Sequence, residues 1–429
     1  MRWRGDGGGG ERGVGGGVGG QSGCRGGGYD APVGSAFYWL VAALVIGGVA
    51  GSPIRALLPG YVEGVAHAPP AFTSLLLSIQ LAVGGLFAVA GGALADRLSR
   101  RTIVLLGIPS AIPGALLFSS TDPYVLVPLA VVWGVLTGFQ TSGGQSFLLG
   151  SVDRTRTGTA TAIYFLTTTL SGAIGAWIGG IVADRFGYAW VAGGGAVLAI
   201  VGVATAARYL PDLGSDASRQ PGPTRIGFVD VFRLPGMWTI VALRFWPTVA
   251  WGIATLVIPL YLYRIAGNAT VPGTYALVSL AVASAGQLAT GRLVDYGTRR
   301  GGSSPPGEPV GMVPPALRRL VLAISIGLLV AAASTAVATS DVIALGITGT
   351  AWTTMAWALS TTMPPLMRAV SPPDAHGRVV GATHLTWSAA MLIGTTLGGA
   401  LVSLDPVAPI LAATGCLLVS AIVAVRFAR

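Results

Sequence analysis

The sequence predicts an all-helical integral membrane protein, with twelve transmembrane helices arranged as two pseudo-symmetric six-helix bundles. Only 10% of the 429 residues are charged, and 52% are hydrophobic, whereas soluble domains carry about a quarter charged residues. Apolar runs of about 20 residues, long enough to cross a bilayer as helices, recur along the chain. A ten-residue pattern also returns after an interval of about two hundred residues, which is typical of a duplicated bundle.

Twelve apolar runs account for the predicted helices. They span roughly residues 36–60, 71–94, 102–121, 123–149, 158–182, 187–209, 237–263, 272–294, 317–339, 341–367, 379–403 and 406–427. Gly, Ala, Val and Leu dominate these runs, and none of them alternates as a lipid-facing barrel strand would. Lipid is therefore the expected solvent of the chain, and helices satisfy the backbone polar groups within it.

The arginines predict the orientation of the spans. The chain contains no lysine, and 22 of its 26 arginines fall in segments on the inner side when the N-terminus is placed in the cytoplasm. Only Arg185 and Arg264 fall outside, and Arg55 and Arg244 fall within spans. This asymmetry follows the positive-inside rule and predicts a multi-pass protein of the plasma membrane with both termini cytoplasmic. No basic aromatic patch is present, so we expect no nucleic-acid partner.

The composition outside the spans predicts the organisation of the chain. Residues 1–34 are rich in Gly and Arg, and we expect a disordered cytoplasmic tail there. Residues 35–209 form the predicted N-terminal bundle, and residues 237–429 form the predicted C-terminal bundle. The segment 210–236, which contains four prolines, is expected to be the cytoplasmic linker between them.

The duplicated pattern lies just after the second and eighth apolar runs. Residues 92–101 read GALADRLSRR, and residues 291–300 read GRLVDYGTRR. Both copies have Gly, three residues, Asp, three residues and a pair of arginines. The positions that we single out are Gly92, Asp96, Arg97, Arg100 and Arg101 in the first copy and Gly291, Asp295, Arg299 and Arg300 in the second. Pro59 and Pro259 precede the two copies at almost the same distance.

A second repeat consists of glycines in the fifth and eleventh runs. Its members are Gly175, Gly179 and Gly180 in one copy and Gly394, Gly398 and Gly399 in the other. Glycines at this spacing remove the side chains from one helix face, so that a neighbouring backbone can approach closely. We interpret them as helix-packing residues, and a role in gating is the alternative.

The first copy of the ten-residue pattern resembles the signature loop between helices two and three of the major facilitator superfamily. The usual form is Gly-x-Leu-Ala-Asp-Arg-x-Gly-Arg-Arg, and this chain departs from it only at Ser99. The degenerate copy, the twelve spans and the central linker also match, so that the resemblance covers residues 35–429. It implies two halves that rock about a central cavity.

The resemblance further implies that Asp96 belongs to a latch that closes the inner face and favours the outward-open state. A carboxylate at an inner helix end can accept from the N-terminal amides of a helix in the other half and can pair with arginine. Arg378, just before the eleventh run, is the candidate partner. Positive-inside anchoring alone is the alternative; it explains Arg100 and Arg101 but leaves Asp96 without a role.

The two arginines within spans are the sharpest candidates for substrate contact, because charges inside a membrane are costly and are usually functional. In repeat coordinates Arg55 and Arg244 share an equivalent helix face, but their depths differ by about 16 Å. We hypothesise that Arg244 faces the cavity in its inner half and Arg55 near the outer mouth, each attracting an anionic or polar substrate. The alternatives are snorkelling of Arg55 to the interface and a structural pairing of Arg244.

The remaining cavity candidates are weaker. No Asp or Glu lies in the middle of a span, so His384 in the eleventh run is a candidate proton relay, with a packed, hydrogen-bonded histidine as the alternative. Gln140 and Gln287 could contact a polar substrate. Trp251 and Trp357 could stack on a flat ligand, although packing or interfacial anchoring is the default role of tryptophan in a span.

These observations predict a secondary active transporter that moves a small molecule by alternating access. We expect an exporter of drug-like or other metabolites; the alternatives are uptake of organic anions, sugars or other metabolites, and a transport-dead membrane sensor. The expected partners are the substrate, a coupling ion (H⁺ or Na⁺) and the bilayer, with the protein as a monomer. We expect no cofactor, metal or catalytic residue, and the chain lacks the phosphate-binding loop of a primary pump.

Overall fold

The computed structural model describes residues 35–95, 98–151, 157–212, 230–300, 313–370 and 376–429. Every regular element within these ranges is a helix, and eleven of the described helices are long and apolar enough to cross a membrane. The predicted all-helical membrane fold is confirmed. The residues 1–34 and most of the linker, for which we predicted a disordered tail and a connecting loop, lie outside the described ranges.

The helices form two groups, each of which packs within itself. The first half contains α1 (Ser35–Gly51), α2 (Pro53–Gly64), α3 (Pro70–Ala95), α4 (Arg100–Gly107), η1 (Ile108–Ser110), α5 (Ala111–Leu116), α6 (Pro123–Ser151), α7 (Thr157–Phe186) and α8 (Tyr188–Tyr209). The second half contains α9 (Met237–Ala266), α10 (Thr270–Arg300), α11 (Pro315–Val337), α12 (Val342–Val370), α13 (His376–Val402) and α14 (Ala408–Ala428), preceded by the short helix η4 (Asp230–Arg233).

The third predicted span is broken into α4, η1 and α5, so the prediction of one continuous helix over 102–121 is wrong in this detail. Pro109 and Pro113 lie in this segment and have no backbone N–H to donate, which weakens a helix from within. Gly107, at the end of α4, lies so close to the backbone of Gln140 on α6 that no side chain would fit between them. These three pieces complete the set of twelve spans.

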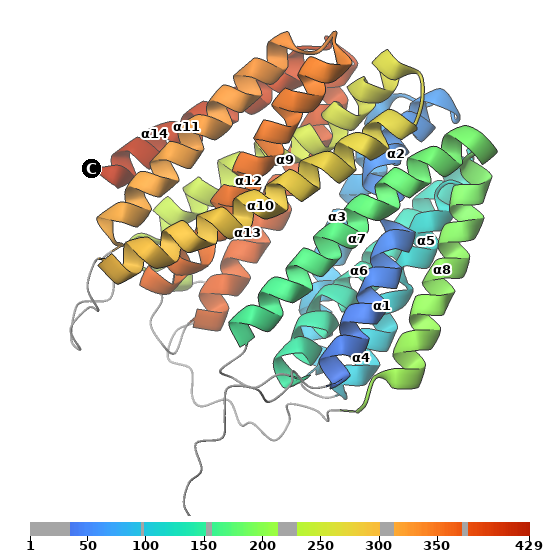
Figure 1. The fold of residues 1–429 in the computed structure, drawn as a ribbon, viewed down its shortest axis with the longest axis horizontal. Coiled ribbons are helices and arrows are strands. Elements are labelled where there is room, and N and C mark those ends of the chain that lie inside the picture. Colours follow the sequence, from blue (N-terminus) through green and yellow to red (C-terminus); the bar gives the residue numbers. More distant parts are fainter. Residues whose placement is uncertain (1–34, 96–97, 152–156, 213–229, 301–312, 371–375) are drawn as a thin grey trace, which may run out of the picture.

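The contacts between the halves are concentrated on three helix pairs. The pairs are α7 with α10, α3 with α13, and α2 with α9. In Figure 1 the blue-to-green helices of the first half and the yellow-to-red helices of the second half come together near α2 and spread apart toward the opposite end. The molecule therefore has one end at which its halves converge.

The internal duplication is visible in a pair of equivalent tyrosines. Tyr61 on α2 donates a hydrogen bond to the carbonyl of Ser120, with an O···O distance of 2.9 Å. Tyr261 on α9, two hundred positions later, donates to the carbonyl of Pro406. Each tyrosine ties the first span of its half to a turn, but the two turns differ: Ser120 precedes α6, the fourth span, and Pro406 precedes α14, the twelfth. The two bundles are pseudo-symmetric, as the sequence predicts.

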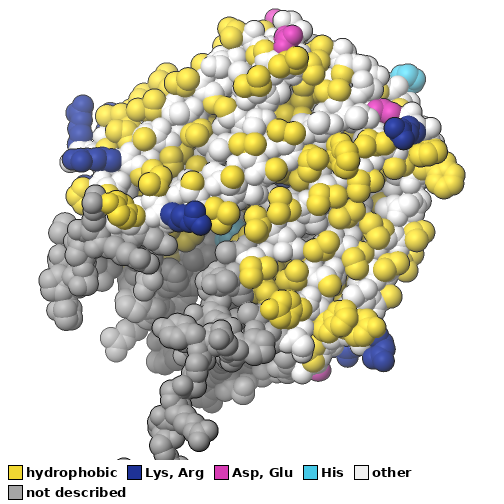
Figure 2. Space-filling model, viewed as in Figure 1, with side chains coloured by type: hydrophobic (Ala, Val, Ile, Leu, Met, Phe, Trp, Pro, Cys, Tyr) yellow, Lys and Arg dark blue, Asp and Glu magenta, His cyan; other side chains and the backbone are white. Residues whose placement is uncertain are grey.

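The surface matches a lipid environment. Figure 2 shows hydrophobic side chains covering the broad face of the molecule, with the charged side chains near its margins. Large aromatic residues are exposed at helix ends, among them Tyr124 and Trp190. At the end where α1 begins, the rings of Trp39 and Tyr209 stack with their centroids 4.0 Å apart. Aromatic residues at these levels are typical of membrane–water interfaces.

Candidate functional site

A cavity of about 530 Å³ lies between the two halves. Helices α1, α2, α3, α6 and α7 of the first half line it, together with α9, α10 and α12 of the second half. Sites for small organic molecules typically measure about 300–1,000 Å³. The cavity therefore has the size of a small-molecule site, and its walls belong to both bundles.

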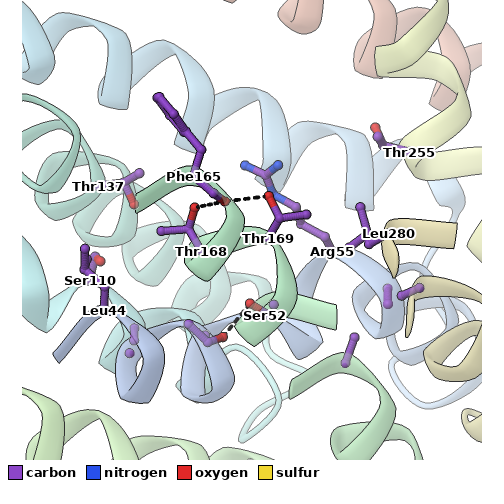
Figure 3. Close-up of a pocket in the computed structure, with 18 of the residues that line it drawn as sticks. Leu44, Ser52, Arg55, Ser110, Thr137, Phe165, Thr168, Thr169, Thr255 and Leu280 are labelled. Atoms are coloured by element: carbon purple, nitrogen blue, oxygen red, sulfur yellow. Dashed lines mark hydrogen bonds between the residues drawn. The ribbon is translucent and has the colours of Figure 1, made fainter. Parts of the chain in front are cut away.

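Arg55 reaches this cavity because the first span is interrupted. Pro53 has no backbone N–H to continue the helix, and the Oγ of Ser52 donates to the carbonyl of Gly48 with an O···O distance of 2.5 Å. The helix resumes as α2, and Arg55 falls in its first turn. Figure 3 shows the Arg55 side chain extending from α2 toward Thr169 of α7.

Arg55 is the one charged side chain among the described residues that line the cavity. Its side chain is exposed to the cavity rather than packed in the protein. Over the described ranges, neither an ion pair nor a hydrogen bond joins it to another residue. An unpaired guanidinium inside the membrane-spanning region is costly, so this position is unlike an ordinary structural arginine.

Hydroxyl groups line the wall around Arg55. Thr168 and Thr169 on α7 both donate to the carbonyl of Phe165, each with an O···O distance of 2.9 Å. Across the cavity, Thr255 on α9 donates to the carbonyl of Gly252 at 3.0 Å. A hydroxyl that donates its hydrogen to a carbonyl of its own helix still has lone pairs that can accept hydrogen bonds. These walls therefore offer acceptor oxygens to whatever enters.

The cavity includes some of the sequence-predicted residues and not others. Besides Arg55, the residues Gln140, Trp251 and Trp357 line it, and Gln140 accepts a 2.7 Å hydrogen bond from Ser110 through its Oε1. The Nε1 of Trp357 is buried without a hydrogen-bond partner. The three predicted residues that the structure places outside the described lining are Arg244, Gln287 and His384.

Arg244 and His384 lie close to each other instead. Arg244 is on α9 and His384 on α13, two helices that pack tightly, and the charges of the two side chains are near enough to interact. The Nε of Arg244 is buried without a hydrogen-bond partner. Gln287 is partly buried on α10. Over the described ranges, no acidic residue forms an ion pair with this second intramembrane arginine.

Two acidic side chains make contacts that join the halves where they converge. Glu63, near the end of α2, accepts hydrogen bonds from the Nε and Nη2 atoms of Arg264 on α9, both with N···O distances of 2.6 Å. Asp184, near the end of α7, accepts from the backbone amides of Ala269 and Thr270, both at 2.7 Å, and from the Thr270 hydroxyl. We call the end that carries Glu63, Asp184 and Arg264 the sealed end.

Asp184 acts as an N-terminal cap for a helix of the other half. Thr270 is the first residue of α10, and the first amides of a helix have no partner within it. A carboxylate satisfies these amides and also stabilises the positive end of the helix dipole. The contact therefore ties α7 to α10 only while the two halves are together at the sealed end.

The predicted packing glycines occupy matched places in the two bundles. Gly175 lies against the backbone of Val49 on α1, and Gly394 lies against the backbone of Val249 on α9. Gly179 lies against the side-chain ring of Pro53 on α2. These glycines let the fifth and eleventh spans touch the first helix of their own half, with no side chain between them.

Gly398 completes the matched set, because it lies against Ile253 on α9. The last glycine of each copy faces the other half. A Cβ at Gly180 would lie 2.6 Å from the carbonyl oxygen of Ala269, and one at Gly399 would lie 2.6 Å from the Cβ of Ser74. We call these two crossings the glycine seams.

Hydrogen bonds cross the interface near the middle of the spans as well. Ser78 on α3 lies 2.9 Å from the hydroxyl of Thr396 and 3.3 Å from that of Thr395, both on α13. Together with the sealed end and the glycine seams, these contacts join the halves from one end to the middle of the molecule.

Most of the ten-residue signature falls where the side chains are not described. Asp96 and Arg97 lie outside the described residues. Gly92 lies in α3, Asp295, Arg299 and Arg300 in the last turns of α10, and Arg378 in the first turn of α13, but their side chains also lie outside the described part. Gly291 lies in α10 with open space beside it. The contact of Asp96 with Arg378 therefore stays a prediction.

The described part of the signature has structural roles. Ser99, where the family usually has glycine, caps α4 by accepting from the backbone amide of Thr102 at 3.3 Å. Arg100 is buried. Arg101 donates to the carbonyl of Ala207 on α8, with an N···O distance of 2.5 Å. The departure at Ser99 is thus a helix cap.

Asp184 and Glu63 were not among the sequence-predicted sites, although a signal for Asp184 was present. Gly180, Asp184 and Arg185 repeat the order Gly, three residues, Asp, Arg of the signature at the opposite end of a helix. Glu63 carries no such signal, because an acid beside a loop is ordinary. Only the fold brings it to Arg264.

Two helical bundles with a cavity between them, joined at one end by breakable contacts, define a membrane transporter rather than an enzyme. The family model of the Major Facilitator Superfamily matches residues 38–304. The chain belongs to the major facilitator superfamily. No curated protein matches it closely enough to suggest a substrate.

Solved structures share the fold at low identity. A POT family transporter in complex with 5-aminolevulinic acid has a TM-score of 0.73 and 13% identity, over 91% of this chain and 96% of that one. A variant of the nucleoside transporter NupG has a TM-score of 0.70 and 11% identity, over 92% and 98%. The human organic anion transporter MFSD10 has a TM-score of 0.65 and 14% identity, over 91% and 98%.

Proposed function

We propose that the chain exports small drug-like or other organic metabolites across the plasma membrane by alternating access, with both termini in the cytoplasm. In this orientation the sealed end faces outward, and the structure is the inward-open state. The proposal is carried by one observation: a small-molecule cavity lies between two halves whose contacts run from one end to the middle of the spans.

The direction of transport rests on the overall resemblance to exporters, and uptake of an organic anion is the second candidate. The unpaired charge of Arg55 in the cavity favours that alternative. The similarity to a human organic anion transporter agrees with it. A transport-dead sensor is a weaker proposal, because a sensor does not need a cavity walled by both halves.

Coupling to H⁺ or Na⁺ is part of the proposal, with the protein acting as a monomer. No acidic residue lines the cavity within the described ranges, so the cavity lining there has no carboxylate, the usual proton carrier in a membrane. The neighbouring Arg244 and His384 are the proposed alternative.

A reversible lock tests alternating access. Ser78 and Thr396 are in hydrogen-bond contact across α3 and α13, close enough for a pair of cysteines at these positions to form a disulfide. In proteoliposomes, the oxidised Ser78→Cys/Thr396→Cys protein should lose transport of any compound that the native protein moves, and reductant should restore it. Each single cysteine variant is the control. Full flux through the oxidised pair would contradict alternating access.

Vesicle orientation tests direction and coupling. Inside-out vesicles should accumulate an exported compound, and right-side-out vesicles should accumulate an imported one. Flux under an imposed pH gradient or an imposed Na⁺ gradient identifies the ion. Accumulation only in right-side-out vesicles would overturn export and would leave the uptake alternative standing.

A further inference from the structure

The side chain of Arg55 has no protein partner over the described ranges, yet it stands in the cavity between the halves. Removing a guanidinium from bulk water without a counter-charge costs several kcal/mol, and proteins normally pair such a group. A counter-ion delivered by the ligand offsets this cost while the site is occupied. The position thus favours a ligand that brings a negative charge.

We propose that the cavity binds a small organic monoanion with an aromatic body, and that its acid group pairs with Arg55. This inference rests on the proposed transport function and names its substrate class. An arginine fork matches a carboxylate with two parallel hydrogen bonds. Arg55 lies at the interrupted first span, so its guanidinium belongs to the first half and the ligand spans toward the second.

The two walls of the cavity differ in charge, and this difference favours a ligand with a single negative charge. With the offset of two hundred residues that relates Pro59 to Pro259, the position equivalent to Arg55 is Thr255. Both residues line the cavity, but only one of them is charged. A monoanion makes the occupied cavity neutral, whereas a dianion leaves one charge without a partner in a region of low dielectric.

The neutral part of the ligand is defined by the other walls. Trp251 and Trp357, which are both partly exposed, line the cavity and offer apolar faces for a flat ring. Thr168 and Thr169 give their hydrogens to Phe165, so that they accept hydrogen bonds from the ligand. The ligand therefore has an aromatic ring, one acid group and a neutral donor such as a hydroxyl.

Equilibrium binding to the purified full-length protein in detergent tests this inference independently of turnover. The probes are para-hydroxybenzoate, its neutral amide para-hydroxybenzamide and the dianion terephthalate, measured by isothermal titration. We expect the native protein to bind the monoanion at least about tenfold more tightly than the amide, because hydrogen bonds to charged groups are the stronger ones. Terephthalate should bind more weakly than the monoanion.

Variants of Arg55 and of a control arginine test whether the preference for the acid over the amide comes from Arg55. Arg55→Gln should weaken binding of para-hydroxybenzoate about tenfold or more and leave binding of para-hydroxybenzamide within about twofold. Arg55→Lys should be intermediate, because it keeps the charge and loses the fork. Arg426→Gln removes an exposed arginine at the end of α14 and should change neither affinity.

The outcomes separate this inference from the proposed function. Native affinity of Arg55→Gln for the monoanion, or equal binding of acid and amide by the native protein, would overturn the monoanion site. Failure of the native protein to bind the monoanion, while neutral or cationic compounds bind or are transported, would overturn it too and leave transport intact. Binding of the monoanion without flux in proteoliposomes would overturn the transport proposal and keep the site.

Discussion

Glu63 and Arg264 form a two-pronged ion pair that joins the first and second halves of the protein at the sealed end. Both hydrogen bonds are 2.6 Å long, and each side chain is about one-third exposed. Arg264 belongs to the few arginines that the positive-inside pattern leaves outside. Its ion pair with Glu63 accounts for this placement, because Arg264 joins the two halves at the sealed end and does not orient the chain in the membrane.

Removing this pair should favour the state in which the sealed end is open. An exposed pair contributes about 1 kcal/mol or less, so Arg264→Gln should change the ratio of the two states by up to about fivefold. Spin labels at Val65 and Ile265, which are both exposed at the sealed end, report the change as a longer distance in pulsed EPR. The native cysteines are first replaced.

Two controls make this prediction specific. A label pair at Val65 and Tyr124 lies within the first half and should keep its distance in every variant. The doubly substituted protein Glu63→Gln/Arg264→Gln should resemble each single variant, because either substitution already removes the ion pair. An unchanged Val65–Ile265 distance in Arg264→Gln would show that the pair does not influence the equilibrium.

The cap provided by Asp184 should matter more than the ion pair. It satisfies two backbone amides and a hydroxyl of α10 at once, and charge-assisted bonds contribute about 1.5–3 kcal/mol. Asp184→Ala should therefore open the sealed end more than Arg264→Gln does, with Asp184→Asn between them. Arg185→Gln, at the neighbouring exposed position, is the control. The ranking is read from the same EPR distances, and a reversed order would contradict the capping argument.

The glycine seam at Gly180 should be intolerant of side chains. Gly180→Val places a methyl-bearing branch against the Ala269 carbonyl, and overpacking of this kind costs about 1–3 kcal/mol. The cost is relieved when the halves separate, so the variant should favour the open sealed end. Gly194→Val on α8, where nothing lies within 4 Å, is the matched control. Equal EPR distances in the two variants would rule out the seam as a determinant of conformation.

Tyr61 and Tyr261 occupy equivalent positions in the two halves, and we expect their hydrogen bonds to stabilise the protein to a similar degree. Tyr61→Phe and Tyr261→Phe each remove a hydrogen bond to a loop carbonyl, which contributes about 1 kcal/mol. Both should lower the Tm in detergent by about 1–2 °C, whereas Tyr124→Phe, at an 89% exposed position, should not change it. A large loss of Tm in only one of the two variants would contradict this expectation of similar stabilisation.

The overall fold could be predicted because its signals are local and repeated. Span length, arginine placement and the return of Pro59 as Pro259 each depend on a short stretch of sequence. The interruption of the third span could not be predicted from its apolar composition. Pro109 and Pro113 are the local signal for it, and the close approach of Gly107 to Gln140 adds a contact between two helices that only the fold reveals.

The cavity lining was predictable only in part: Arg55, Gln140, Trp251 and Trp357 line it as predicted, whereas Arg244 does not. Arg55 stood out because a charge in a span is unusual. Thr168 and Thr169 did not, since threonine is common in spans and usually bonds to its own helix, as it does here. Glu63 is missed for a related reason, because its partner is two hundred residues away.

The glycine seams limit how the protein can move. At Gly180 the neighbouring atoms of the opposite half are all backbone, so no rotamer change can make room there. The two helices at such a seam have to separate together, because packed interfaces switch between discrete arrangements instead of deforming gradually. We therefore expect the two halves to separate at this contact in one step, which would leave small ions no intermediate opening to pass through.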